Sequence, residues 1–116
     1  MITAVHTLLY SEDPERTRAF LRDVLHWPNV DAGGGWLIFK AGPSEMGVHP
    51  TSNDPHHEIS LMCDDISTTM TELTGRGVEF AGPVQDQGFG LIAMMKVPGA
   101  PDMMLYQPKH PVAFSL

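Results

Sequence analysis

Residues 56–84 read HHEISLMCDDISTTMTELTGRGVEFAGPV, and they give the strongest evidence on the fold class. The run over 57–63 predicts a strand. Asp64 and Asp65 then supply carboxylates that can cap a helix, in which apolar residues recur at positions i, i+4 and i+7 from Ile66. Glycines soon afterwards end this helix. The stretch therefore predicts a strand followed by a helix.

The same order of elements occurs on both sides of a polar connector over 50–55. After the second helix, Gly-Pro and Pro-Gly pairs separate three further predicted strands, at 78–80, 90–97 and 103–107. The first part of the chain predicts a strand over 2–10, a helix that begins at Pro14, and strands over 36–41 and 45–49. Each half therefore has a strand, a helix and then further strands.

The two halves align as a weak internal repeat. Asp13 and Asp65 are 52 residues apart, and the same spacing relates His6 to Glu58. Sequence identity between the halves is low, so the repeat is structural. We predict an α+β fold of two βαβββ modules in a single domain, residues 1–116, with module 1 at about 1–52 and module 2 at about 53–116.

Composition excludes several classes of protein. The net charge is −7, which argues against a surface for nucleic acid or for an anionic membrane. The single cysteine, Cys63, excludes an internal disulfide and a zinc site with several cysteines. The N-terminus lacks a cationic region before an apolar run, and no apolar run approaches the roughly 20 residues that a bilayer requires. We expect a soluble, cytoplasmic protein.

Three polar residues have the types that bind a divalent transition metal. His6 and Glu58 hold matching places on the first strands of the two modules, and His49 lies on the last strand of module 1. Other interpretations exist for each residue. A histidine in an apolar strand can be a hydrogen-bonded core or rim residue, and Glu58 can lie on an edge strand that faces water.

A second group of residues has the types that line an apolar pocket. Methionines gather near the last two predicted strands and include Met94 and Met104. Phe89 lies between two glycines, and Trp36 follows three. Flexible thioethers suit a pocket that accepts varied apolar ligands, although methionine is also a common core residue.

Three stretches resemble the vicinal oxygen chelate superfamily, which includes glyoxalase I, bleomycin resistance proteins, fosfomycin resistance enzymes and extradiol dioxygenases. VHTLLYSEDPERTRAFLRDVLHW, residues 5–27, resembles the opening module, and residues 56–84 resemble the second. VPGAPDMMLYQP, residues 97–108, resembles the closing loop and strand. The resemblance implies paired βαβββ modules around an open mixed-sheet cleft. It also implies a homodimer in which strands of both subunits build each site.

The resemblance can be carried over residue by residue. His6 matches the first-strand histidine ligand, and Glu58 stands where the second module usually has histidine. Met104 stands in place of the closing glutamate, and Gly47 in place of the other glutamate of glyoxalases. His49, two residues beyond Gly47, can compensate for the missing glutamate ligand through a shift in geometry.

Two functions follow from these residues. The first is a divergent metal-dependent enzyme of the lyase, isomerase or dioxygenase type, which acts on a small substrate with vicinal oxygens. His6, Glu58 and His49 would hold Zn, Ni, Mn or Fe, Glu58 would be ligand or base, and Tyr106 would donate a hydrogen bond to an oxyanion. The alternative is a metal-free, drug-sequestering protein of the bleomycin and antibiotic resistance type. Its pocket would be lined by Trp36, Phe89, Met94, Met104 and Tyr106.

Overall fold

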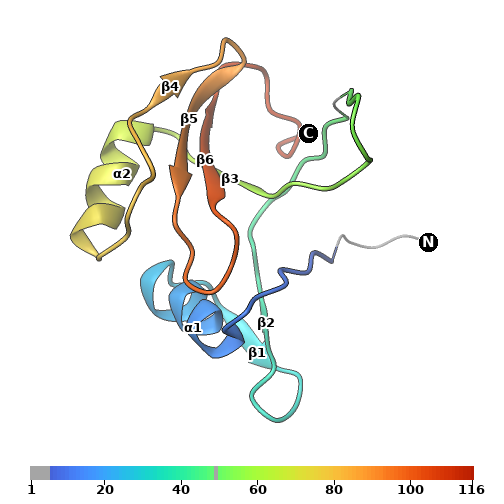
Figure 1. Ribbon diagram of the computed structural model, residues 1–116, viewed down its shortest axis with the longest axis vertical. Helices are drawn as coiled ribbons and strands as arrows, with labels where there is room; N and C mark the ends of the chain where they lie inside the picture. Colours follow the sequence, from blue (N-terminus) through green and yellow to red (C-terminus); the bar gives the residue numbers. More distant parts are fainter. Residues whose placement is uncertain (1–5, 49) are drawn as a thin grey trace.

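A computed structural model describes residues 6–48 and 50–116 of the chain (Figure 1). Its helical segments are α1 (Pro14–Ala19), the π-helical turn η1 (Phe20–Val24) that continues it, and α2 (Ile66–Gly75). The strands are β1 (Asn29–Asp31), β2 (Leu37–Phe39), β3 (Ser60–Met62), β4 (Gln85–Asp86), β5 (Gly90–Met95) and β6 (Met103–Pro108). No helix in the described residues is both long and apolar enough to cross a membrane.

The second module forms a four-stranded sheet in the order β3-β6-β5-β4. β3 runs parallel to β6, because α2 carries the chain across one face before the antiparallel strands begin. The predicted strands over 57–63, 90–97 and 103–107 are thus confirmed with shifted ends. The segment 78–80 contributes only a single bridge, from Phe80 to Met95, and β4 was not predicted.

Helix α2 begins where its sequence indicates and covers one face of this sheet. The Asp65 carboxylate accepts a hydrogen bond of 3.0 Å from the backbone N–H of Thr68, so Asp65 is the cap. The N–H of Ile66 donates to the side chain of Gln107 on β6 at 2.8 Å. Ile66 packs with Ala93 of β5 and Leu105 of β6 in a buried cluster, which fixes the helix on the sheet.

The first module contains a capped helix and a hairpin. The Asp13 side chain accepts a hydrogen bond from the N–H of Arg16, and Pro14 begins α1 as predicted. β1 and β2 are antiparallel. Between them, one oxygen of Asp31 accepts the N–H groups of Gly33 at 2.7 Å and Gly35 at 3.2 Å, so the three-glycine turn is confirmed.

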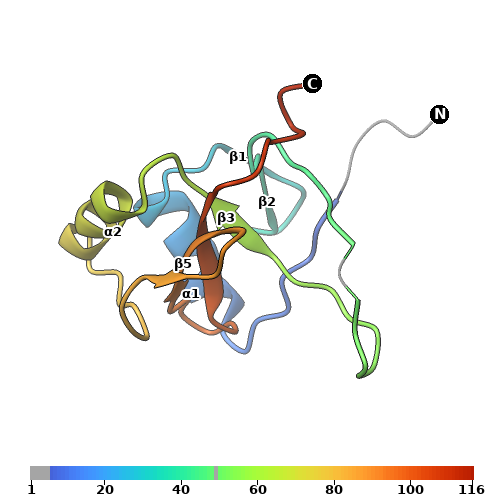
Figure 2. The ribbon, with the colours of Figure 1, turned by 90° about the horizontal axis from the view of Figure 1, so that it is seen from above.

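The described parts of the two outer strands predicted for the first module do not form strands. Residues 6–10 and 45–48 belong to neither sheet, and residues 2–5 and 49 lie outside the described residues. Figures 1 and 2 show that both segments extend away from the four-stranded sheet. A strand needs a neighbour for its backbone hydrogen bonds, and this chain provides none beside either segment in the described structure.

A shared core and a hydrogen-bonded turn join the two modules. Phe20 is buried in a cluster with residues of the second module, including Met95 and Met103. The Thr17 hydroxyl donates to the carbonyl oxygen of Pro98 at 2.6 Å, in the turn between β5 and β6. The carbonyl oxygen of the next residue, Gly99, accepts hydrogen bonds from the Ser11 hydroxyl and from the N–H of Glu12.

Candidate functional site

The helix-free face of the four-stranded sheet is the first candidate site. β-Strand side chains alternate between faces, and the register pairs Met94 with Met104 and pairs Ile92 and Met62 with Tyr106. These five side chains lie opposite the face that α2 covers. We call them the methionine face. All are half-buried.

The methionine face is apolar, adaptable and nearly free of polar atoms. Its three methionines have flexible, polarisable side chains that can adjust to ligands of different shapes. Tyr106 contributes its hydroxyl. Burial raises the pKa of the Tyr106 hydroxyl, and the negative charge of Glu45 raises it further. The hydroxyl therefore stays protonated at neutral pH and can donate a hydrogen bond.

An aromatic cluster lies at one end of this face and consists of Phe89, Tyr106 and His110. The ring centroids of Phe89 and Tyr106 are 5.7 Å apart with an edge-to-face angle of 67°. Those of Tyr106 and His110 are 5.8 Å apart. Both distances fall in the favourable range for ring pairs. The cluster therefore extends the apolar surface beyond the strands.

Glu45 brings a carboxylate from the first module to this cluster. Its Oε2 accepts a hydrogen bond of 2.6 Å from the N–H of Ala113, and its Oε1 lies 3.9 Å from Nε2 of His110. The contact joins the segment after β2 to the chain that follows β6. Neither Glu45 nor His110 was expected from the sequence to be a site residue. Glu45 begins a segment that the sequence predicts as a strand, and His110 follows β6, so no local pattern pairs the two residues.

The structure describes two of the three expected metal ligands, and both are exposed. His6 is exposed in the extended segment before α1, and Glu58 is exposed just before β3. Oε1 of Glu58 lies 3.5 Å from Nε2 of His56. His49 lies outside the described residues. Residues 6–48 and 50–116 contain no group of three residues placed to hold a metal ion.

The five expected pocket residues divide between two places. Met94, Met104 and Tyr106 share the methionine face, and Phe89 contacts Tyr106 at its end. Trp36 instead precedes β2 in the first module, where the guanidinium of Arg18 lies 5.1 Å from its ring centroid. Trp36 is therefore occupied by a cation–π contact of its own.

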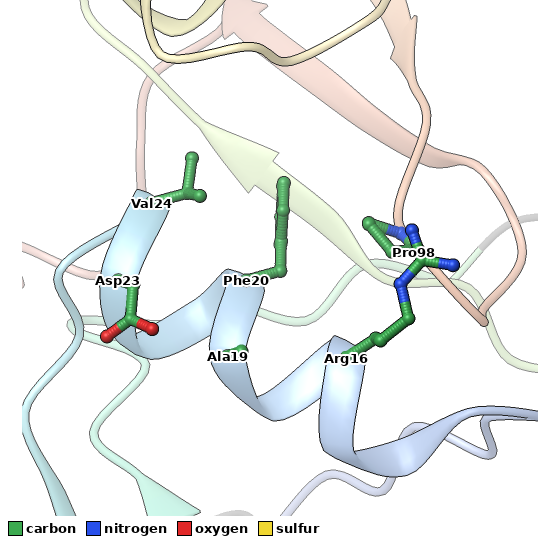
Figure 3. A pocket seen from close by; sticks show the side chains of 6 residues that line it. All are labelled: Arg16, Ala19, Phe20, Asp23, Val24 and Pro98. Atoms are coloured by element: carbon green, nitrogen blue, oxygen red, sulfur yellow. The ribbon is translucent and has the colours of Figure 1, made fainter.

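A separate hollow of about 290 Å³ lies along the first helix (Figure 3). It is lined by Arg16, Ala19, Phe20, Asp23, Val24 and Pro98. None of the residues expected to act in a site is among them. The carboxylate of Asp23 is bound to the guanidinium of Arg22 at 2.7 Å, and this hydrogen bond lowers the pKa of Asp23. The hollow therefore offers few free polar groups.

Comparison of the sequence with protein-family models and with curated proteins gave no match. Comparison of the fold with solved structures gave several. Lactoylglutathione lyase from Agrobacterium tumefaciens superimposes with a TM-score of 0.65 at 19% identity, over 91% of this chain and 94% of that chain. A member of the glyoxalase/bleomycin resistance protein/dioxygenase superfamily from Sphaerobacter thermophilus DSM 20745 gives 0.65 at 20% identity, over 91% and 98%.

A binding protein is among the similar folds as well. TnmS3, an antibiotic-binding protein from Streptomyces sp. CB03234, superimposes with a TM-score of 0.62 at 21% identity, over 94% of this chain and all of that chain. The matched folds thus include one protein described as a lyase and one described as a binding protein.

Proposed function

We propose that this chain, which has the fold of the vicinal oxygen chelate superfamily, binds a small and largely apolar organic molecule on its methionine face. The observation that carries the proposal is the alternation that puts Met62, Ile92, Met94, Met104 and Tyr106 on the helix-free side of one sheet. All five are half-buried in the single chain and therefore still accessible. Similarity to the antibiotic-binding protein TnmS3 supports the same class of function.

The energetics of such a face suit a ligand of moderate size. Each square ångström of apolar surface removed from water contributes about 25 cal/mol. A drug-sized ligand gains about 0.3 kcal/mol for each non-hydrogen atom after the costs of association. A molecule of about 25 such atoms therefore reaches a Kd in the low micromolar range. The Tyr106 hydroxyl would orient a polar atom of the ligand.

We further propose that two copies of the chain build the complete site. The unpaired segments 6–10 and 45–48 carry exposed apolar side chains, among them Leu8, Tyr10 and Val48. A second copy would supply strand neighbours for these segments and a second wall for the methionine face. Light scattering during size-exclusion chromatography tests this proposal. A dimer is expected, and Val48→Asp should shift it toward monomer while Val84→Asp, on the loop before β4, should not.

Methionine-methyl NMR with a neutral aromatic probe, 1-naphthylmethanol, tests the binding proposal. The methyl signals of Met62, Met94 and Met104 should shift, whereas that of Met95, on the opposite face, should not. Met104→Gln should weaken binding several-fold, because it places an amide on the apolar face. The matched control is Met70→Gln on α2, which should leave the affinity unchanged in folded protein. Unchanged signals from all three methyl groups at millimolar probe would refute the proposal.

The second candidate function is a divergent metal-dependent enzyme, whose acting residues would be His6, Glu58 and His49. It is favoured by the matching positions of His6 and Glu58 in the repeat, and by the similarity to a lactoylglutathione lyase. Elemental analysis after incubation with Zn, Ni, Mn or Fe(II) tests it. About one metal ion for each chain, lost in a folded His6→Ala variant, would support the enzyme. Metal uptake that His6→Ala leaves undiminished would remove His6 as a ligand.

A further inference from the structure

Glu45 has an open hydrogen-bonding position next to the aromatic cluster. Its Oε2 is already bound to the N–H of Ala113 at 2.6 Å. Its Oε1 lies 3.9 Å from Nε2 of His110, which is too long for a hydrogen bond. Within the described part of the chain, no group donates a hydrogen bond to Oε1. The side chain of Glu45 is only 17% exposed, so solvent screens its charge less than that of a surface carboxylate.

His110 presents a second acceptor toward the same point. Its Nδ1 lies 2.7 Å from the carbonyl oxygen of Pro111 and must be the donor, because a carbonyl only accepts. In the neutral imidazole, Nε2 therefore carries a free lone pair. Nε2 and Oε1 of Glu45 are 3.9 Å apart, a separation that one nitrogen can bridge with two hydrogen bonds of about 2.8 Å.

The surroundings favour a cation at this point. The rings of Phe89, Tyr106 and His110 lie close together, and aromatic rings attract ammonium groups. The neighbouring cation, Lys109, is held by the carboxylate of Asp86 at 2.7 Å, so its charge is paired. The chain as a whole has a net charge of −7, which attracts cationic molecules from solution.

We infer that the ligand of the methionine face is an aromatic or polycyclic amine, with its apolar body on the methionines and its ammonium group between Glu45 and His110. This inference rests on the proposed function and adds the chemical class of the ligand. A ligand that carries a carboxylate in the same position is disfavoured, because its charge would face that of Glu45.

Three probes of one shape test the inference: 1-naphthylmethylamine, 1-naphthylmethanol and 1-naphthoate, each titrated by calorimetry at neutral pH. The amine should bind about five- to tenfold more tightly than the alcohol, the size expected for a cation–π contact together with a partly screened ion pair. The naphthoate should bind more weakly than the alcohol. Glu45→Gln should abolish the preference for the amine and leave the alcohol's affinity within about twofold, since glutamine can still accept from Ala113.

The matched control is Glu72→Gln on α2, which also removes one carboxylate charge, but from a group that is paired with Arg76 and lies on the covered side of the sheet. It should keep the full preference for the amine. A measurement without any variant gives a second test. Raising the ionic strength from about 0.05 to about 0.5 M should weaken binding of the amine and not of the alcohol, because salt screens the attraction of the ammonium group to the protein's carboxylates and the alcohol carries no charge.

The outcomes separate this inference from the proposed function. Equal affinity for the amine and the alcohol in the unaltered protein would overturn the inference and leave the proposed function standing. A preference for the amine that persists in Glu45→Gln, or that salt does not change, would also overturn it. If none of the three probes binds, the proposed function itself fails.

Discussion

Replacement of Gly99 by alanine tests whether the turn between β5 and β6 holds the two modules together. Gly99 has a φ of 75°, and a Cβ built there would lie 2.8 Å from the Ser11 hydroxyl and 2.9 Å from the backbone N and O of Asp13. The left-handed backbone alone costs alanine about 1 kcal/mol relative to glycine. The close contacts would also force the turn away from Ser11 and Thr17 and break about two hydrogen bonds, each with a net contribution of about 1 kcal/mol. The expected loss of unfolding free energy is therefore about 3 kcal/mol.

Gly42→Ala separates the backbone cost from the cost of lost contacts. Gly42 has a similar φ of 79°, but nothing lies within 4 Å of a Cβ built there. This variant should lose only about 1 kcal/mol. Urea unfolding followed by circular dichroism measures both variants, at one protein concentration because a dimer would make stability depend on it. The urea concentration at the midpoint of unfolding should fall by about 1.5 M in Gly99→Ala. Equal losses of unfolding free energy in the two variants would refute the conclusion that contacts of Gly99 hold the two modules together.

Three further predictions concern the core, the second helix and an ion pair. Phe20→Ala should destabilise the folded chain by about 3–5 kcal/mol, because Phe20 is buried between the modules, and a loss under 1 kcal/mol in urea unfolding would contradict that placement. Asp65→Ala should cost about 1 kcal/mol by the same assay and Asp64→Ala much less, since only Asp65 accepts the hydrogen bond that caps α2. The hydrogen bond from Lys109 holds the pKa of Asp86 below its ordinary value of 3.8. The stabilisation that this ion pair contributes is therefore fully present at pH values above 3.8, and it is lost as the pH falls through the folded-state pKa of Asp86. Lys109→Met should raise the pKa of Asp86 in an NMR titration toward the ordinary value, and an unchanged pKa would show that the pair does not form in solution.

The elements that could be predicted are those fixed by local signals. The cap at Asp65 and the helical spacing that begins at Ile66 both lie within one short stretch, and α2 begins at the expected residue. Strand alternation likewise placed Met104 with Tyr106, as the register shows. β4 escaped prediction because it is only two residues long and pairs at the edge of the sheet.

Elements that depend on distant partners could not be predicted. The segments 6–10 and 45–48 have strand-like sequences, but strand formation also requires a neighbour that one chain does not provide beside them. The contact of Glu45 with Ala113 and His110 joins irregular segments far apart in the sequence. Neither segment has a pattern that points to the other. The shared side of Met104 and Tyr106 was therefore predictable, and the charged group near them was not.

The position of β6 in the sheet sets the order in which this chain can fold during synthesis. β6 lies between β3 and β5, although it is the last of the strands to leave the ribosome. β3 therefore has no neighbouring strand until Met104, the partner of Ser60, has been synthesised. Long-range pairings of this kind slow folding. Phe20 also packs against Met103, so the core that joins the modules closes only at this stage. A nascent chain that ends before residue 103 would expose the inner edges of β3 and β5, where chaperones or a second chain would bind.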